Sequence, residues 1–149
     1  MNEPRINANG EQRKHWDLCR DIVRVFYEVY NELGYGFLEA VYEEALSRAL
    51  RDGGFKVDRQ VPTPIWFRGS VIREYKADLL VNRAVLLELK AAQGIDPSHK
   101  AQILNYLRAT EFEVGLLLNF GPKPQFHRFI FENNRKGLRG DSRSFAAKQ

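Results

Sequence analysis

The stretch VGLLLNF at residues 114–120 constrains the fold more than any other part of this sequence. It is a continuous apolar run of strand length, which is typical of a strand buried on both faces of a sheet. Residues 97–109 before it predict a helix, because Pro97 suits a first helical turn and Asp96 can cap it. A helix that joins two strands predicts a right-handed crossover between them. We therefore expect an α/β fold with a mixed central sheet and helices on both of its faces.

The other segments of regular pattern fit one domain, as expected for 149 residues. Helical spacing of apolar side chains predicts two helices, at residues 11–33 and 37–51. The second helix is predicted to bury Leu38, Val41, Tyr42, Ala45, Leu46 and Ala49. Strand-like segments lie at 55–60, 61–67, 71–81, 85–90 and 126–131. We expect the folded domain at residues 11–133, a flexible N-terminus at 1–10 and a flexible basic tail at 134–149.

Segments 71–81 and 85–90 predict a hairpin that brings two acidic residues together. Pairing Leu80 with Leu86 leaves a three-residue loop, a common hairpin length. The same register sets Asp78 opposite Glu88, with Cβ atoms roughly 5 Å apart. Strict alternation puts Ala77, Leu79 and Val81 on one face, and Lys76, Asp78 and Leu80 on the other. Because facing like charges are destabilising unless a cation lies between them, this register predicts a metal site.

Oxygen ligands of this kind suit a hard divalent cation, Mg²⁺ in first place and Mn²⁺ as an alternative. Asp78 and Glu88 are the predicted ligands, and Glu39, near the start of the second helix, offers a further carboxylate. The backbone carbonyl of Leu89 is an additional candidate ligand. Such an ion can neutralise charge on a phosphate and lower the pKa of a bound water molecule.

Three more side chains are candidates for the chemistry beside the metal. Lys90 projects from the same strand face as Glu88 and is predicted to orient the attacking water or stabilise the oxyanion. Gln102 and Tyr106 are four residues apart on the helix that follows, so they share a helical face. They are predicted to hold the scissile phosphate or the nucleophile, with ordinary helix packing as the alternative.

Two sets of these residues resemble known families. The first set matches the GxxExxY signature of a family of small bacterial proteins: Gly36, Glu39 and Tyr42. The second resembles the PD-(D/E)XK nuclease superfamily: Asp78, then Glu88-Leu89-Lys90 ten residues later. Gln102 and Tyr106 are similar to the QxxxY element of its RecB and lambda-exonuclease branch. Ala77 stands where the superfamily name has proline.

This resemblance covers about residues 15–131. It implies a restriction-endonuclease-like core that hydrolyses phosphodiester bonds with Mg²⁺. By position, Asp78 and Glu88 would bind the metal, Lys90 would activate or orient water, and Glu39 would be the helix carboxylate. Without the resemblance, Glu39 also fits an acid favoured by the helix dipole, and Tyr42 fits the core.

The net charge of +4 and the pI of 9.3 favour an anionic partner, so we expect nucleic acid, and DNA in particular. Lys76, His99 and Lys100 are the candidate contacts, although a surface role also suits His99. The single cysteine, Cys19, excludes an intrachain disulfide and is expected to be a buried thiol. With neither a signal peptide pattern nor a membrane-length apolar run, we expect a soluble, cytoplasmic protein.

Two other functions remain open at this point. The same fold can serve as a non-catalytic module that binds nucleic acid or a protein. A homo-oligomer that uses the aromatic last strand is the weaker idea, since the alternating rings of Phe126, Phe129 and Phe131 are more often part of a core.

Overall fold

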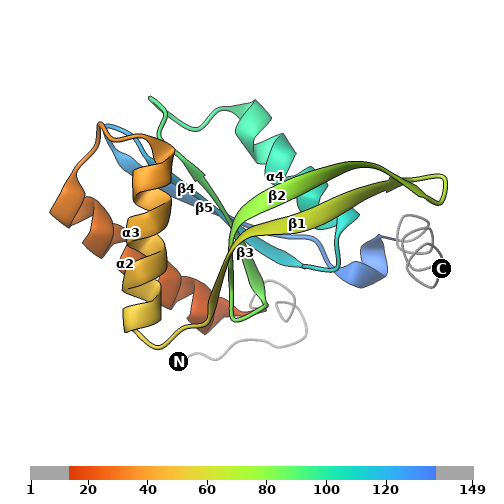
Figure 1. Ribbon diagram of the computed structural model, residues 1–149, viewed down its shortest axis with the longest axis horizontal. Coiled ribbons are helices and arrows are strands. Elements are labelled where there is room, and N and C mark those ends of the chain that lie inside the picture. The colour runs from red at the N-terminus through yellow and green to blue at the C-terminus, as the bar shows by residue number, and fades with distance from the viewer. Residues whose placement is uncertain (1–13, 137–149) are drawn as a thin grey trace.

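The structure is a computed structural model that describes residues 14–136, so the predicted flexible residues 1–10 and most of the predicted tail lie outside the described part. The helices are α2 (Trp16–Leu33), α3 (Glu39–Asp52) and α4 (Pro97–Ala109) (Figure 1). The strands are β1 (Val57–Phe67), β2 (Ser70–Val81), β3 (Val85–Lys90), β4 (Val114–Phe120) and β5 (Pro124–Ile130). None of the described helices combines the length and apolar character needed to cross a membrane.

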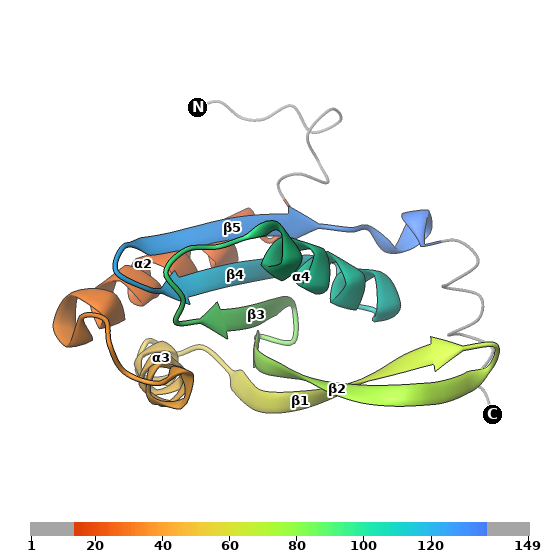
Figure 2. The same ribbon diagram turned by 90° about the horizontal axis from the view of Figure 1, so that it is seen from above.

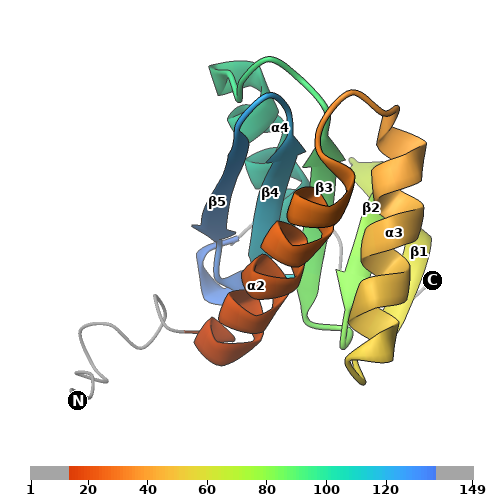
Figure 3. The same cartoon turned by 90° about the vertical axis from the view of Figure 1, so that its left-hand side faces the viewer.

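The five strands form one mixed sheet in the order β1-β2-β3-β4-β5. Strands β3 and β4 are parallel and are joined through α4, whereas the other neighbours are antiparallel. Helices α2 and α3 cover one face of the sheet, and α4 lies against the other (Figure 3). The prediction of an α/β fold with helices on both faces is therefore confirmed.

Strand β4 separates two apolar cores, and all seven of its residues are buried as predicted. Leu116 and Leu118 point into the larger core with α2 and α3, while Leu117 points into the smaller core under α4. Burying one such leucine contributes roughly 1.5–3 kcal/mol, so a strand buried on both faces is a main source of stability.

Helix α3 buries a narrower face than its pattern predicts. Tyr42, Leu46 and Leu50 are fully buried, but Leu38 is 79% exposed and Val41 39% exposed. The prediction that these last two are buried was wrong. Leu38 has extended backbone and precedes the helix as its N-cap, so it is not part of any helical face, and Val41 flanks the buried stripe.

The hairpin between β2 and β3 has the predicted register, with Leu80 opposite Leu86. Strand β2 stays beside β3 only over Leu79–Val81, yet pairs with β1 over most of its length. Figure 2 shows β1 and β2 continuing together as a twisted ribbon beyond the short strand β3. The predicted segments 55–60 and 61–67 thus form one strand, β1, at the edge of the sheet.

The alternation of side chains between the two faces of β2 is interrupted where this strand separates from β3. The β1–β2 ladder pairs Arg59 with Leu79 and Val61 with Ala77, but the intervening Gln60 and Asp78 are not paired. Gln60 has a left-handed backbone with φ of 50°. Ala77 consequently packs with Leu80 in the smaller core instead of with Leu79. The prediction that Ala77 shares a face with Leu79 and Val81 was therefore wrong, because strict alternation of side chains assumes an uninterrupted ladder.

The described structure also continues past the expected domain limit at residue 133. A 3-10 helix spans Asn133–Arg135, and Lys136 is buried with its ammonium group donating to the carbonyl oxygens of Thr110 and Phe112. Of the aromatic residues considered for an oligomer, Phe129 packs against the smaller core and Phe126 is 41% exposed. Oligomer formation stays a prediction.

Candidate active site

The carboxyl groups of Asp78 and Glu88 meet where the sheet divides. The backbone N–H of Leu89 donates to Asp78 Oδ2 over 2.8 Å, and the N–H of Asp78 lies 3.4 Å from Glu88 Oε2. These bonds replace the strand pairing that ends at Leu79. Interruption of the ladder therefore brings both acidic side chains to the junction of β2 and β3.

The surroundings of these acids oppose their ionisation. Glu88 is only 6% exposed, and burial together with the charge of Asp78 raises its pKa to about 7. Burial also raises the pKa of Asp78, and the nearby acids Glu43 and Glu39 add to this effect. Two crowded carboxylates with raised pKa values form an environment that a bound cation would stabilise.

Two tyrosines complete the buried side of this cluster. The Tyr75 hydroxyl donates a hydrogen bond to Glu88 Oε2, and its ring stacks on Tyr106 with an interplanar angle of 18°. Burial is the main reason why the pKa of both phenols is raised. Sequence reasoning missed Tyr75, because strict alternation puts it on the opposite face from Asp78. The interrupted ladder is the reason why it reaches Glu88.

Lys90, Gln102 and Tyr106 form a hydrogen-bonded chain on the exposed side of the cluster. Lys90 Nζ lies 3.4 Å from Gln102 Oε1, and Gln102 Nε2 donates to the Tyr106 hydroxyl over 2.9 Å. The three residues come from the end of β3 and from α4. The structure therefore brings five of the predicted residues into one connected cluster: Asp78, Glu88, Lys90, Gln102 and Tyr106.

The chain segment after Lys90 is held by the end of β4. Buried Asn119 accepts a hydrogen bond from the N–H of Ala92 and donates to the carbonyl of the same residue. Gly121 leaves room for this contact, since a Cβ there would lie 1.9 Å from the Ala92 oxygen. Lys90 is thus anchored from both sides, by its pairing with Asn119 in β4 and by this contact.

Glu39 lies in the first turn of α3 and is exposed, with no hydrogen bond to the acids. Its neighbour one turn later, Glu43, has the larger electrostatic effect on Asp78 and was not predicted. Glu43 pairs with Arg59 and Gln60, next to the interruption of the ladder. Its spacing of four from Glu39 was the sequence signal that could have identified it.

Tyr42 organises the approach to this helix from within the core. Its ring stacks on Phe120, while its hydroxyl donates to the carbonyl of Gly34 and accepts from the N–H of Phe37. Gly36 adopts φ of 115°, which side chains rarely allow. Gly36 and Tyr42 therefore shape the loop that leads to Glu39.

The remaining candidates lie apart from the cluster. The N–H of Asp96 donates to His99 Nδ1 in a capping box, which is a structural use of the side chain. Lys100 lies near His127, whose pKa is lowered by burial and by the charge of this lysine. Lys76 is exposed on β2. The Leu89 carbonyl stays a predicted ligand.

Among residues 14–136, no three His, Cys, Asp or Glu side chains converge on one point. Asp78 and Glu88 supply a pair of hard oxygen donors, and Mg²⁺ commonly takes one or two carboxylates with water and phosphate oxygens completing its shell. Burial and the charge of Asp78 raise the pKa of Glu88, and the charge of Lys90 only partly opposes this shift. The donor set therefore fits Mg²⁺ better than a metal that needs an all-protein shell.

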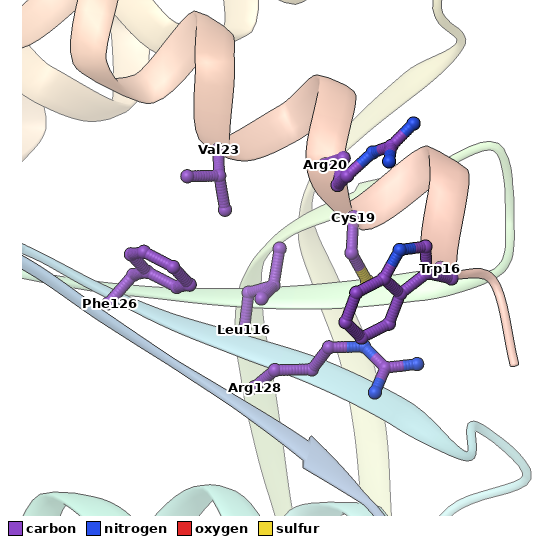
Figure 4. Close-up of a pocket in the computed structure, with 7 residues that line it drawn as sticks. All are labelled: Trp16, Cys19, Arg20, Val23, Leu116, Phe126 and Arg128. Carbon is purple, nitrogen blue, oxygen red and sulfur yellow. The ribbon is translucent and has the colours of Figure 1, made fainter. Parts of the chain in front are cut away.

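A separate apolar cavity of about 200 Å³ lies between α2 and strands β4 and β5, on the sheet face opposite α4. Figure 4 shows Cys19 next to Trp16, with Arg128 extending beneath them. Burial raises the pKa of the Cys19 thiol, which fits the predicted structural role and disfavours a thiolate nucleophile.

Comparisons with known proteins agree with this fold. A family profile described as PD-(D/E)XK nuclease superfamily matches residues 16–129. No curated protein matches the chain. A solved structure titled "Crystal structure of SSO0001" is similar, with a TM-score of 0.50 and 17% identity over 69% of this chain and 56% of that one. The chain thus spans little more than half of that structure, and the likeness shows the fold alone, which is consistent with a restriction-endonuclease-like architecture.

Proposed function

Since the chain belongs to the PD-(D/E)XK nuclease superfamily, we propose that it hydrolyses phosphodiester bonds of nucleic acid, with Mg²⁺ as cofactor and Mn²⁺ as a substitute. One observation carries the proposal. Two carboxyl groups, the buried Glu88 and the half-buried Asp78, meet at the end of the shared ladder, and Lys90 joins them from the same strand end with Gln102 beside it. A purely structural domain has no need to hold two acids together at a largely buried position.

Asp78 and Glu88 are the proposed metal-binding side chains, with Glu39 and the Leu89 carbonyl as further candidates. When bound, the ion would neutralise phosphate charge and lower the pKa of a coordinated water. The hydrogen bond from the Leu89 N–H to Asp78 and the bond from Tyr75 to Glu88 keep both carboxylates oriented before any ligand arrives. Such preorganisation avoids a cost of rearrangement during the reaction.

Lys90 is the proposed residue that orients the attacking water and stabilises the charge that develops on the phosphate. Gln102 holds the lysine ammonium group through its amide oxygen and is itself held by Tyr106. This contact restricts the long lysine side chain, which otherwise samples many rotamers. Gln102 and Tyr106 therefore act mainly by positioning.

The proposed substrate is DNA in first place, in line with the net charge of +4. Lys76 and Lys100 are proposed as outlying phosphate contacts. The role of His99 is the least supported, given its use in the cap of α4. Placement in the GxxExxY family and in the RecB and lambda-exonuclease branch belongs to this proposal and rests on Gly36, Glu39, Tyr42, Gln102 and Tyr106.

The test is cleavage of labelled single- and double-stranded DNA and RNA in Mg²⁺, in Mn²⁺ and in EDTA. Wild-type protein is expected to cleave at least one of these substrates with a metal and none in EDTA. Asp78→Ala and Lys90→Ala are expected to abolish cleavage. Asp17→Asn, in an exposed acid on α2, is the matched control and should leave cleavage unchanged.

Two results would contradict the proposal. One is the absence of cleavage by wild-type protein under every metal condition. The other is full activity of the Asp78→Ala and Lys90→Ala proteins, since a contaminating nuclease would then be the source. Metal-independent binding of nucleic acid without cleavage would instead favour the alternative of a non-catalytic binding module.

A further inference from the structure

The exposed face of α4 carries an open hollow that continues the cluster away from the two acids. It has a volume of about 410 Å³ and is lined by Ser98, Ala101, Gln102, Asn105 and Tyr106. Gln102 and Tyr106 belong to the cluster already described, so the hollow begins where that cluster ends. Its volume lies within the range of about 300–1,000 Å³ that is usual for small-molecule sites.

The lining combines polar groups with apolar surface and contains no charged side chain. Ser98 and Asn105 lie on the same helical face as Gln102, and the small side chain of Ala101 leaves the hollow open between them. A phosphate would call for lysine or arginine, which this lining lacks. Amide groups combine a donor pair with an acceptor, which is the pattern that matches the edge of a nucleobase.

Asn105 is the residue on this face whose side chain is not engaged by the described part of the protein itself. It is exposed, and within residues 14–136 its side chain makes no hydrogen bond, unlike Gln102 with its two bonds. Asparagine has a modest helix propensity, and nothing in the packing of α4 requires it at an exposed position. A free amide beside a hollow is available to a ligand.

We infer that this hollow is a nucleobase subsite that receives an unpaired base next to the scissile phosphate, with Asn105 bound to the edge of that base. The inference rests on the proposed function, because it takes Lys90 and the acids as the place of the phosphate. In duplex DNA the bases are stacked inside the helix and cannot fill such a hollow. The substrate class is therefore single-stranded nucleic acid, or a single-stranded end.

Binding without cleavage tests this directly. Fluorescence anisotropy would follow a fluorescein-labelled 12-nucleotide oligo(dT) strand and a labelled 12-base-pair duplex, with Ca²⁺ in place of Mg²⁺. Asn105→Ala removes the amide, and Ala101→Leu fills the hollow from an exposed position. Asn31→Ala, at an exposed asparagine on α2, is the matched control.

Both hollow variants are expected to bind the single strand at least about fivefold more weakly, the scale of one base contact, while the control binds as wild type. Duplex binding should not depend on either substitution. Unchanged single-strand affinity in both variants would overturn the inference, and so would an equal loss for duplex and single strand.

Failure of the inference and failure of the proposed function give different results. If wild-type protein cleaves in Mg²⁺ but binding ignores Asn105, the hollow has another role and the nuclease stands. If binding depends on Asn105 but no cleavage occurs, the subsite stands and the hydrolysis is refuted. If wild-type protein neither binds nor cleaves, both are refuted.

Discussion

The two sides of the candidate site differ in their contact with water. The wall that we call buried consists of Glu88, which is only 6% exposed, and the half-buried Tyr75 and Asp78, where β2 and β3 separate. The exposed wall consists of Lys90 and Gln102, whose hydrogen bond is open to solvent. Interactions between charges are strong in the buried wall and weakened by water in the exposed one.

This difference separates two tasks. The buried wall stores an unfavourable charge arrangement, visible in the pKa of Glu88 near 7, which a cation would relieve. The exposed wall offers polar groups that a polymer can reach from outside. We expect substitutions in the buried wall to change metal affinity and stability, and those in the exposed wall to change substrate handling.

The largest effect is expected from Glu88→Gln in the buried wall. It keeps the shape of the side chain but removes the negative charge, so cleavage should fall at least about 100-fold, the scale for losing one preorganised electrostatic group. Initial rates with a labelled oligonucleotide measure this, and the exposed acid substitution Glu28→Gln is the control. Retention of more than a tenth of the activity would place the metal elsewhere.

The same Glu88→Gln substitution should stabilise the metal-free protein at high pH. The folded-state pKa of about 7 lies above the ordinary value of 4.5, so the native state holds the proton longer than the unfolded chain. Wild-type stability therefore falls as pH rises from about 4.5 to 7, by about 3 kcal/mol in all. Denaturant unfolding in EDTA measures the free energy of unfolding of both proteins. Glu88→Gln should be as stable as wild type at pH 4 and more stable than wild type by this amount at pH 8. An equal gain at both pH values would refute the electrostatic explanation.

A smaller effect is expected from Tyr75→Phe, which removes only the hydroxyl that binds Glu88. Loss of such a supporting bond typically lowers metal affinity by about 10–100-fold. Calorimetric titration with Mn²⁺ measures the change in metal affinity. Tyr35→Phe, at an exposed tyrosine, should bind Mn²⁺ as wild type does. Equal affinities for Tyr75→Phe and wild type would show that Tyr75 only packs against Tyr106.

The smallest effect is expected from Gln102→Ala in the exposed wall. Its hydrogen bonds to Lys90 and Tyr106 are solvent-exposed, so stability should stay within about 0.5 kcal/mol of wild type. Cleavage should fall by less than the Glu88→Gln loss, through a less ordered Lys90. Single-turnover rates and Mn²⁺ affinities of Gln102→Ala and wild type test this. A large loss of metal affinity in Gln102→Ala would show that the two walls do not differ in function.

Local patterns in the sequence were sufficient for most of the fold. The apolar run of β4 predicted burial on both faces, and the three-residue loop predicted the pairing of Leu80 with Leu86. These features depend on neighbours close in sequence and on the period of a strand. That register also predicted the proximity of Asp78 and Glu88, which the structure shows in their shared hydrogen bonds.

Tertiary structure alone decided how β2 leaves the sheet. The interruption at Gln60 and Asp78 arises because β2 follows β1 into the twisted ribbon while β3 stays with β4. It changes the face that Ala77 and Tyr75 present, and it lets Gln60 bind Glu43. Periodicity assumes an uninterrupted ladder, so neither the break at Asp78 nor the loss of β3 as a neighbour can be read from the spacing of the residues in β2.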